Sequence, residues 1–130
     1  MSGVGGRGRL TKKDVVTSLA INSWIHGDKV VWKRVRLRWV DMRGFNLKRA
    51  DLRGADLRGA DLQGAKLKKA ALSYSKLVGA DLKGADLTHA SLVDASLRNA
   101  DLKGANVWGA RLSGAVLTGA RLDIVMAAPE

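Results

Sequence analysis

Residues 50–64 read Ala-Asp-Leu-Arg-Gly, Ala-Asp-Leu-Arg-Gly, Ala-Asp-Leu-Gln-Gly, three nearly identical five-residue units in succession. Sixteen such units follow one another without a gap from Phe45 to Ile124. The central residue of each unit is leucine, except Val107, and the residue two positions before it is alanine, except Phe45 and Ser75. Repetition this strict predicts that every unit adopts the same local structure.

A period of five fits neither an ordinary helix nor a flat strand. An α-helix turns once in about 3.6 residues, so a five-residue repeat would spread its leucines around the whole surface. A strand alternates every two residues, so consecutive units would point their leucines to opposite faces. The pattern is consistent if each unit ends in a corner, often at a glycine, that turns the chain by a fixed angle. Such a chain closes into coils that stack as a solenoid.

The units resemble the pentapeptide-repeat family, whose motif is A-[D/N]-L-x-x. The resemblance covers 16 consecutive units, or residues 45–124. It implies an all-β solenoid in the form of a right-handed, four-sided parallel β-helix with four units in each coil. It also implies that the central leucines and the preceding alanines fill a narrow core. The family resemblance by itself says little about function.

The five-residue frame extends upstream of Phe45 with larger side chains at the inward positions. Residues 29–44 are therefore predicted to form a degenerate first coil, and the solenoid is predicted to span residues 29–124 in about five coils. The inward positions of the degenerate coil are Val30, Trp32, Val35, Leu37, Val40 and Met42.

The two ends of the chain differ in their predicted structure. Residues 1–10 form a Gly/Arg arm, either an ordinary flexible terminus or a basic segment that orders on a partner. Residues 11–28 are predicted to hold a helix that starts at Thr11 in a capping-box-like turn and stops near Gly27. This helix would cover the first coil, unless it is a separate partner-binding helix. Residues 125–130 offer no such cap, so a contact is expected at the C-terminal end.

The composition excludes several classes of protein. The chain has no cysteine, so it has neither disulfides nor a thiolate metal site. It has no apolar run of about 18 residues that would span a membrane. The apolar segment near residue 15 is interrupted by polar residues, which argues against a signal peptide and favours a cytoplasmic location. We expect neither a metal nor a cofactor.

The residues that usually perform catalysis are not arranged for it. His26 and His89 are each isolated in the sequence, and the aspartates recur with the repeat and not as an acid/base pair. The glycines are spaced as corners, unlike the glycines of a phosphate-binding loop. The sequence therefore predicts a protein that is not an enzyme.

The formal net charge of +11 is the strongest compositional feature, and it is unevenly distributed. Residues 30–69 carry a net charge of +8 and residues 70–130 carry none. With four units in a coil, the cations would surround the first two coils as a collar that docks on an anionic partner. The candidate anion-binding residues are Arg34, Arg36, Arg38, Lys48, Arg49, Arg53, Arg58, Lys66, Lys68 and Lys69.

A return to the same side after 20 residues also places like residues above one another. Asp41, Asp61, Asp81 and Asp101 would form one ladder, with Arg43, Gln63, Lys83 and Lys103 beside it. Neighbouring ladders of opposite charge relieve the repulsion within each ladder. We interpret this side as electrostatically self-compensating and not as a carboxylate site.

Apolar residues at outward positions are concentrated in the second half of the chain. Several of them on one rod favour a protein contact. Trp39, beside the cationic Arg38, would either stack on a base or pack against the predicted N-terminal helix. The candidate protein-contact residues are Tyr74, Val93, Trp108, Ile124, Val125 and Met126.

These features predict a non-enzymatic interaction or scaffold module. Its basic half would dock on nucleic acid, a ribonucleoprotein or an acidic protein surface, and its neutral half would contact protein in a multi-subunit assembly. Some proteins of the resembled family protect DNA gyrase as acidic DNA mimics that dimerise through their C-terminal ends. The positive charge disfavours that function here, although an end-to-end homodimer stays open. Peripheral binding to anionic membranes and a pure assembly spacer are open as well.

Overall fold

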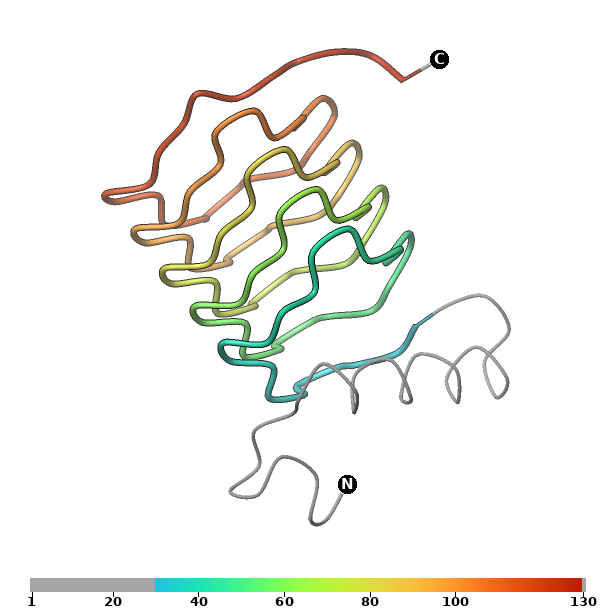
Figure 1. Ribbon diagram of the computed structural model, residues 1–130, viewed down its shortest axis with the longest axis vertical. Coiled ribbons are helices and arrows are strands. Elements are labelled where there is room, and N and C mark those ends of the chain that lie inside the picture. The colour runs from blue at the N-terminus through green and yellow to red at the C-terminus, as the bar shows by residue number, and fades with distance from the viewer. Residues whose placement is uncertain (1–29, 130) are drawn as a thin grey trace.

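The chain winds around a single axis as a stack of similar coils, and each five-residue unit forms one side of a coil (Figure 1). The computed structural model describes residues 30–129; the arm and helix predicted for residues 1–28 lie outside the described residues. The residue before each central position forms a parallel bridge to the residue 20 positions later, from Val31 with Asp51 to Asp101 with Arg121. Four units therefore return the chain to the same side. The last bridge joins Asn106 with Val125, so the separation in sequence is one residue smaller than in the others.

The backbone groups of the inner coils are paired with the coils on either side. The amide of Asp51 donates to the carbonyl of Val30, and the amide of Leu52 donates to the carbonyl of Ala71, both at 2.8 Å. Within the unit, the amide of Ala55 donates to the carbonyl of Leu52 at 3.0 Å and closes the corner. Each unit contributes a single bridging residue, so residues 30–129 contain neither a helix nor an extended strand.

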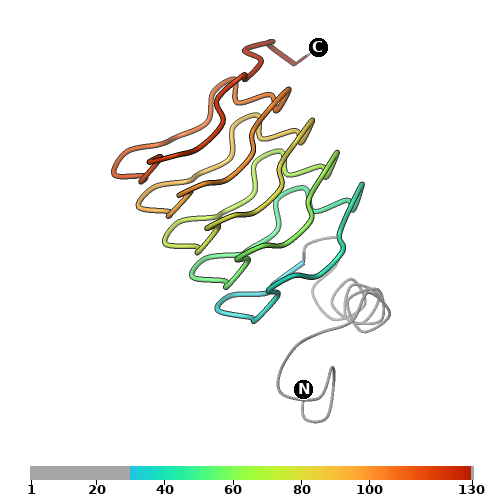
Figure 2. The same ribbon diagram turned by 60° about the vertical axis from the view of Figure 1, so that its left-hand side comes forward.

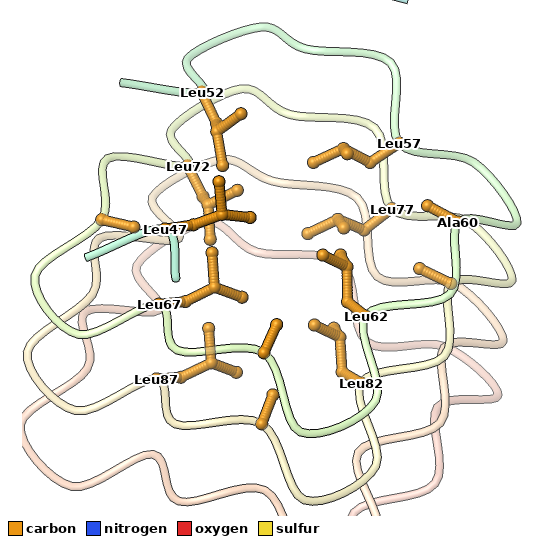
Figure 3. Close-up of a cluster of buried hydrophobic side chains, with 14 of the residues drawn as sticks. Leu47, Leu52, Leu57, Ala60, Leu62, Leu67, Leu72, Leu77, Leu82 and Leu87 are labelled. Carbon is orange, nitrogen blue, oxygen red and sulfur yellow. The ribbon is translucent and has the colours of Figure 1, made fainter. Parts of the chain in front are cut away.

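The interior is filled by the central residues and by the alanines two positions before them, as predicted (Figure 3). Leu52, Leu57, Leu62 and Leu67 are fully buried, as are Ala55 and Ala60. A buried leucine stabilises the fold by about 1.5–3 kcal/mol relative to an exposed one. Ser75 takes the place of an alanine in this interior, and its hydroxyl has no hydrogen-bond partner in the described part of the chain.

The degenerate first coil also buries its inward residues. Trp32 is 3% exposed and Met42 is fully buried, while Val35 and Phe45 are half-buried against the same core. These side chains are larger than the leucine and alanine of later coils. The sequence-based placement of the inward positions of residues 30–44 is thus confirmed, whereas the total of about five coils stays a prediction.

The solenoid has four sides, which we label by their central residues (Figures 1 and 2). Side A contains Trp32, Leu52, Leu72, Leu92 and Leu112. Side B contains Leu37, Leu57, Leu77, Leu97 and Leu117. Side C contains Met42, Leu62, Leu82, Leu102 and Leu122. Side D contains Leu47, Leu67, Leu87 and Val107.

The corner residues have positive φ angles and contact one another from coil to coil. Gly59 and Gly64 have φ angles of +67° and +65°, and Trp39 has a φ of 63°. Where a larger residue occupies a corner, its side chain can extend over the corner of the next coil. The Trp39 ring fills the space that a side chain at Gly59 would need, whereas nothing lies within 4 Å of that position at Gly64.

Replacement of these two glycines by alanine separates the strain of a positive φ angle from the steric clash between the new side chain and its neighbour. Gly64→Ala is expected to lower the free energy of unfolding by about 1–2 kcal/mol, because a non-glycine residue is strained at positive φ. Gly59→Ala is expected to cost about 1–3 kcal/mol more, because the Trp39 ring must also move. Urea unfolding of the two variants measures the difference.

The double variant Trp39→Ala/Gly59→Ala supplies the control. In the Trp39→Ala background, the added Gly59→Ala change should lower the free energy of unfolding by no more than Gly64→Ala lowers it in the unmodified chain. Equal losses for Gly59→Ala and Gly64→Ala in the presence of Trp39 would contradict the packing explanation.

Candidate functional site

Arginines on sides A and B are held by aspartates of their own units. Asp51 and Arg53 flank the same central leucine and point outward together, because residues two apart on a strand share a face. Arg53 donates from Nε and Nη2 to the two carboxylate oxygens of Asp51 at 2.8 and 2.7 Å. Arg58 makes the same two bonds to Asp56, also at 2.8 and 2.7 Å. Both guanidinium groups are therefore already engaged.

The engaged aspartates are more acidic than ordinary carboxyl groups. Hydrogen bonds from Arg53 lower the pKa of Asp51, and hydrogen bonds from Arg58 lower the pKa of Asp56. Each carboxylate also lies near a cation of the preceding coil. Lys33 lowers the pKa of Asp51 further, and Arg38 pairs with Asp56 at 3.6 Å. The positive charge predicted for these two sides is thus partly neutralised.

Side C compensates its own charges, as its ladders predict. Arg43 bridges two rungs, at 2.9 Å from Asp41 and 3.7 Å from Asp61. Lys83 pairs with Asp81 at 3.5 Å. Arg121 extends the ladder beyond its predicted members, because it stacks directly on Asp101 and pairs with it at 3.5 Å. Aspartate and cation alternate closely enough here that little net field is left for a partner.

Side D differs from the other three because its first two units lack an aspartate. Asn46 and Lys66 stand where sides A, B and C have Asp51, Asp56 and Asp61, and they are paired rungs of one ladder. Five cations lie on this side and its following corner, and none of them makes an ion pair within residues 30–129. We call this group the side D cluster; it consists of Lys48, Arg49, Lys66, Lys68 and Lys69.

The side D carboxylate nearest to the side D cluster is hydrogen-bonded within its own five-residue unit. Asp86 is the rung next to Lys66, and it accepts hydrogen bonds from the hydroxyl and the amide of Thr88 at 2.7 and 3.0 Å. It makes no ion pair with Lys66 in the described structure. The side D cluster is therefore the part of the predicted collar whose positive charge is least compensated.

The ten predicted anion-binding residues consequently fall into two groups. Five form the side D cluster, and the other five lie on sides A and B or their corners: Arg34, Arg36, Arg38, Arg53 and Arg58. The Cγ atom of Arg34 lies over the corner at Gly54, 3.2 Å from the position that a Cβ atom would take there. Arg36 stacks on Asp56 without an ion pair in the described part of the chain. The distinguishing sequence feature is the residue before the central leucine, which is Asp in the units of Arg53 and Arg58 and Asn or Lys in the first two units of side D.

The predicted protein-contact residues are exposed to different degrees. Tyr74 and Met126 are 67% and 62% exposed, and Val125 and Ile124 are 42% and 38% exposed. Val93 is half-buried on side A. Trp108 is half-buried on side D, where its ring meets the ring of His89 edge-on, with centroids 5.0 Å apart and an interplanar angle of 88°. His89 is thus not an isolated residue in space.

The C-terminal end of the core is open. A cavity of about 90 Å³ is surrounded by apolar side chains of the last coils. Its lining residues include Leu112, Leu117, Leu122 and Ile124, and Leu122 is 47% exposed. After the last corner, the Asn106 side chain bonds to the backbone of Ala127 at 2.9 and 3.2 Å and fixes the segment there.

Other kinds of site find no support in the part of the chain that the structure describes. No group of three or more His, Cys, Asp or Glu residues within 30–129 is arranged to hold a metal ion. The same residues form no helix of the length and apolarity needed to cross a membrane.

The repeats match the family model described as pentapeptide repeats, over residues 33–68, 65–104 and 95–123. A pentapeptide repeat protein from the thylakoid lumen of Arabidopsis thaliana is 32% identical with a TM-score of 0.68, covering 71% of this chain and 63% of that chain. HetL from Nostoc sp. strain PCC 7120, described as involved in heterocyst differentiation regulation, is 37% identical with a TM-score of 0.53, covering 75% and 46%.

A further pentapeptide repeat protein from Nostoc PCC 7120 is 30% identical with a TM-score of 0.57, covering 81% of this chain and 74% of that chain. The chain spans less than two thirds of the length of the Arabidopsis protein and of HetL. No curated protein sequence matches it significantly.

The arginine–aspartate pairs predict how stability depends on pH. Folding lowers the pKa of Asp51 and Asp56, so their contribution to stability is complete above the ordinary carboxyl pKa of about 3.9. It is lost as the pH falls through the lowered folded-state pKa, because the unfolded chain then binds more protons. The loss of stability between pH 7 and pH 3 should therefore be smaller in Asp51→Asn/Asp56→Asn. Urea unfolding at the two pH values measures it.

Arg53→Gln/Arg58→Gln provides the matched variant, since hydrogen bonds from these arginines are the largest cause of the lowered pKa values. It should reduce the acid sensitivity in the same direction. An acid sensitivity that neither double variant changes would show that other carboxylates determine it.

Proposed function

The chain belongs to the pentapeptide-repeat family, whose fold is a right-handed β-helix, and from this premise we propose that it acts as an interaction module that binds an anionic partner through its basic N-terminal half. Proteins of this family are generally structural or interaction modules. The proposed partner is a nucleic acid, a ribonucleoprotein or an acidic protein surface. A catalytic role forms no part of the proposal, and the proposed location is cytoplasmic.

The observation that carries this proposal is the side D cluster. A surface arginine that already donates to a carboxylate gains little from a second anion, because it must give up the first. Lys48, Lys66 and Lys68 have no such partner to give up within residues 30–129. Neutralisation of an anionic partner by these groups would release counterions and strengthen binding at low salt. The compensated arginines of sides A and B would contribute orientation more than affinity.

A protein contact of the C-terminal half is the second element of the proposal. The open end of the core exposes Leu122, Val125 and Met126 next to a cavity lined by apolar side chains. Amides on this last coil, such as those of Leu112 and Leu117, have no backbone partner in the described structure. An apolar end with an unpaired edge favours association, either with a second copy end to end or with a protein of a larger assembly.

Two competing functions have less physical support. A DNA mimic that modulates topoisomerases needs an anionic rod, and residues 30–69 carry a net charge of +8. Peripheral attachment to an anionic membrane would gain about 1 kcal/mol for each clustered cation, but the arginines of sides A and B that would add to this gain are already engaged with aspartates.

Retention on heparin, a sulfated polyanion, tests the anionic partner. Lys48→Gln/Lys68→Gln should elute at a clearly lower salt concentration than the unmodified chain, because it removes two cations of the side D cluster that make no ion pair within residues 30–129. The matched control Lys76→Gln/Lys103→Gln removes the same charge from sides B and C and should shift elution less. Equal shifts would show that total charge and not side D governs binding.

Light scattering across a concentration series tests association through the C-terminal end. The full chain should change from monomer to dimer as its concentration rises, and Ile124→Glu/Met126→Glu should stay monomeric, because charges at the open end oppose burial. Val93→Glu on side A is the control and should associate like the unmodified chain. A monomer at every concentration would eliminate the homodimer and leave a different protein as the candidate partner.

A further inference from the structure

We infer that side D is a binding surface for single-stranded nucleic acid, with its cations on the phosphates and Trp108 beneath a base. This inference rests on the proposed function, because it names the anionic partner. It depends on two features that share one side of the solenoid: the cations of the first coils, which make no ion pair within residues 30–129, and an aromatic pair farther along the axis.

The cations form two neighbouring columns along the solenoid axis. Lys48 and Lys68 occupy one column, and Arg49 and Lys69 occupy the adjacent corner, each pair separated by one coil. Successive rungs are about 4.8 Å apart, so these four groups cover a compact area of one side. A flexible polyanion that crosses this area can place successive phosphates near different cations. The backbone of a nucleic acid carries such a regular series of charges.

The same two columns lead to the aromatic pair. Continuing from Lys68 they reach Thr88 and Trp108, and continuing from Lys69 they reach His89 and Gly109. Gly109 leaves room for the His89 ring, since a side chain there would lie 2.6 Å from His89 Nδ1. The His89 ring meets Trp108 edge-on at 5.0 Å. In this T-shaped arrangement the imidazole can lie against only one face of the indole, so it leaves the opposite face uncovered.

Asp86 is the negative group on this side, and its position defines the path of the ligand. It lies in the third column, with Asn46, Lys66 and Asn106, on the far side of the central leucines from the corner. Its carboxylate accepts both hydrogen bonds of Thr88. Because these bonds bring the carboxylate to the Lys48 column at Thr88, a strand that follows the corner column of Arg49, Lys69 and His89 toward Trp108 places its phosphates farther from it. The third column is also closed at its end by the contact of Asn106 with Ala127.

Single-stranded nucleic acid fits these features better than a duplex or an acidic polypeptide. Unpaired bases can stack on an aromatic side chain of a flat β surface, as they do on the sheets of RNA-recognition domains. The bases of a duplex are stacked on one another and do not reach a ring on a flat surface. An acidic polypeptide matches the cations but has no requirement for Trp108.

Fluorescence anisotropy of the full chain with labelled 20-nucleotide dT and U oligomers tests the inference. The two oligomers distinguish DNA from RNA, and a 20-base-pair duplex and poly-glutamate serve as competitors. We expect the single strands to bind with log Kobs falling by about 2.8 for each tenfold rise in salt, the value for four neutralised phosphates. Lys48→Gln/Lys68→Gln should reduce this slope by about 1.4.

The tryptophan separates stacking from charge. Trp108→Leu should weaken binding roughly 5- to 150-fold while leaving the salt slope unchanged, and Trp108→Phe should retain most of the affinity. Trp39→Leu, at a corner of side B, is the matched control and should bind like the unmodified chain. Thermal unfolding of each variant verifies that it is folded.

The outcomes distinguish this inference from the broader proposal. Equal or tighter binding of the duplex or of poly-glutamate, with no effect of Trp108→Leu, would overturn the single-stranded ligand and leave the anionic partner standing. An absence of binding to all of these polyanions and to heparin at low salt would overturn both. Loss of single-strand binding in Trp108→Leu with retention in Trp108→Phe would support the inference.

Discussion

The structure depends on the stacking of one buried leucine per five residues in a core that has room for little else. Leu52, Leu57, Leu62 and Leu67 come from four successive units and are all fully buried. After the first coil, the remaining space in nearly every unit is taken by an alanine, so a larger residue there would have to displace a neighbour in the next coil. Loss of a buried leucine side chain costs about 2–5 kcal/mol, and the neighbouring coils share that loss. This constraint fixes the register at 20 residues and thereby the position of every outward side chain.

The fixed register also determines the electrostatics, because it places identical residues above one another. Side C could not stack Asp41, Asp61 and Asp81 without cations between them, and Arg43 and Lys83 supply these. Sides A and B reach the same result within single units, through the bidentate Arg53 and Arg58 pairs. Side D stacks Lys48 on Lys68 with no aspartate in either unit. Its uncompensated charge is a cost to the isolated solenoid that an anionic ligand would remove.

The two ends of the described solenoid are not equivalent. At the N-terminal end, Trp32 and Met42 are almost completely buried, while Leu122 at the other end is 47% exposed. The exposed apolar residues of the last coil follow from the geometry, since a stacked core has a bare layer where stacking stops. A rod with one open apolar end and one cationic side offers separate surfaces for two partners.

The sequence by itself determined the repeat, the inward columns and the self-compensation of side C, because all three follow from a period of five and a return after four units. The sequence also shows that the cation of Asp51-Leu52-Arg53 has an aspartate in its own unit, whereas the cations of Lys66-Leu67-Lys68 have none. The charge distribution nevertheless predicts a single collar that includes the cations of both units. Only the tertiary structure decided which cations make ion pairs within residues 30–129, because ion pairing depends on side-chain geometry within and between coils, as in the contact of Arg38 with Asp56. The pairing of His89 with Trp108, 19 residues apart, likewise requires the coils to be stacked.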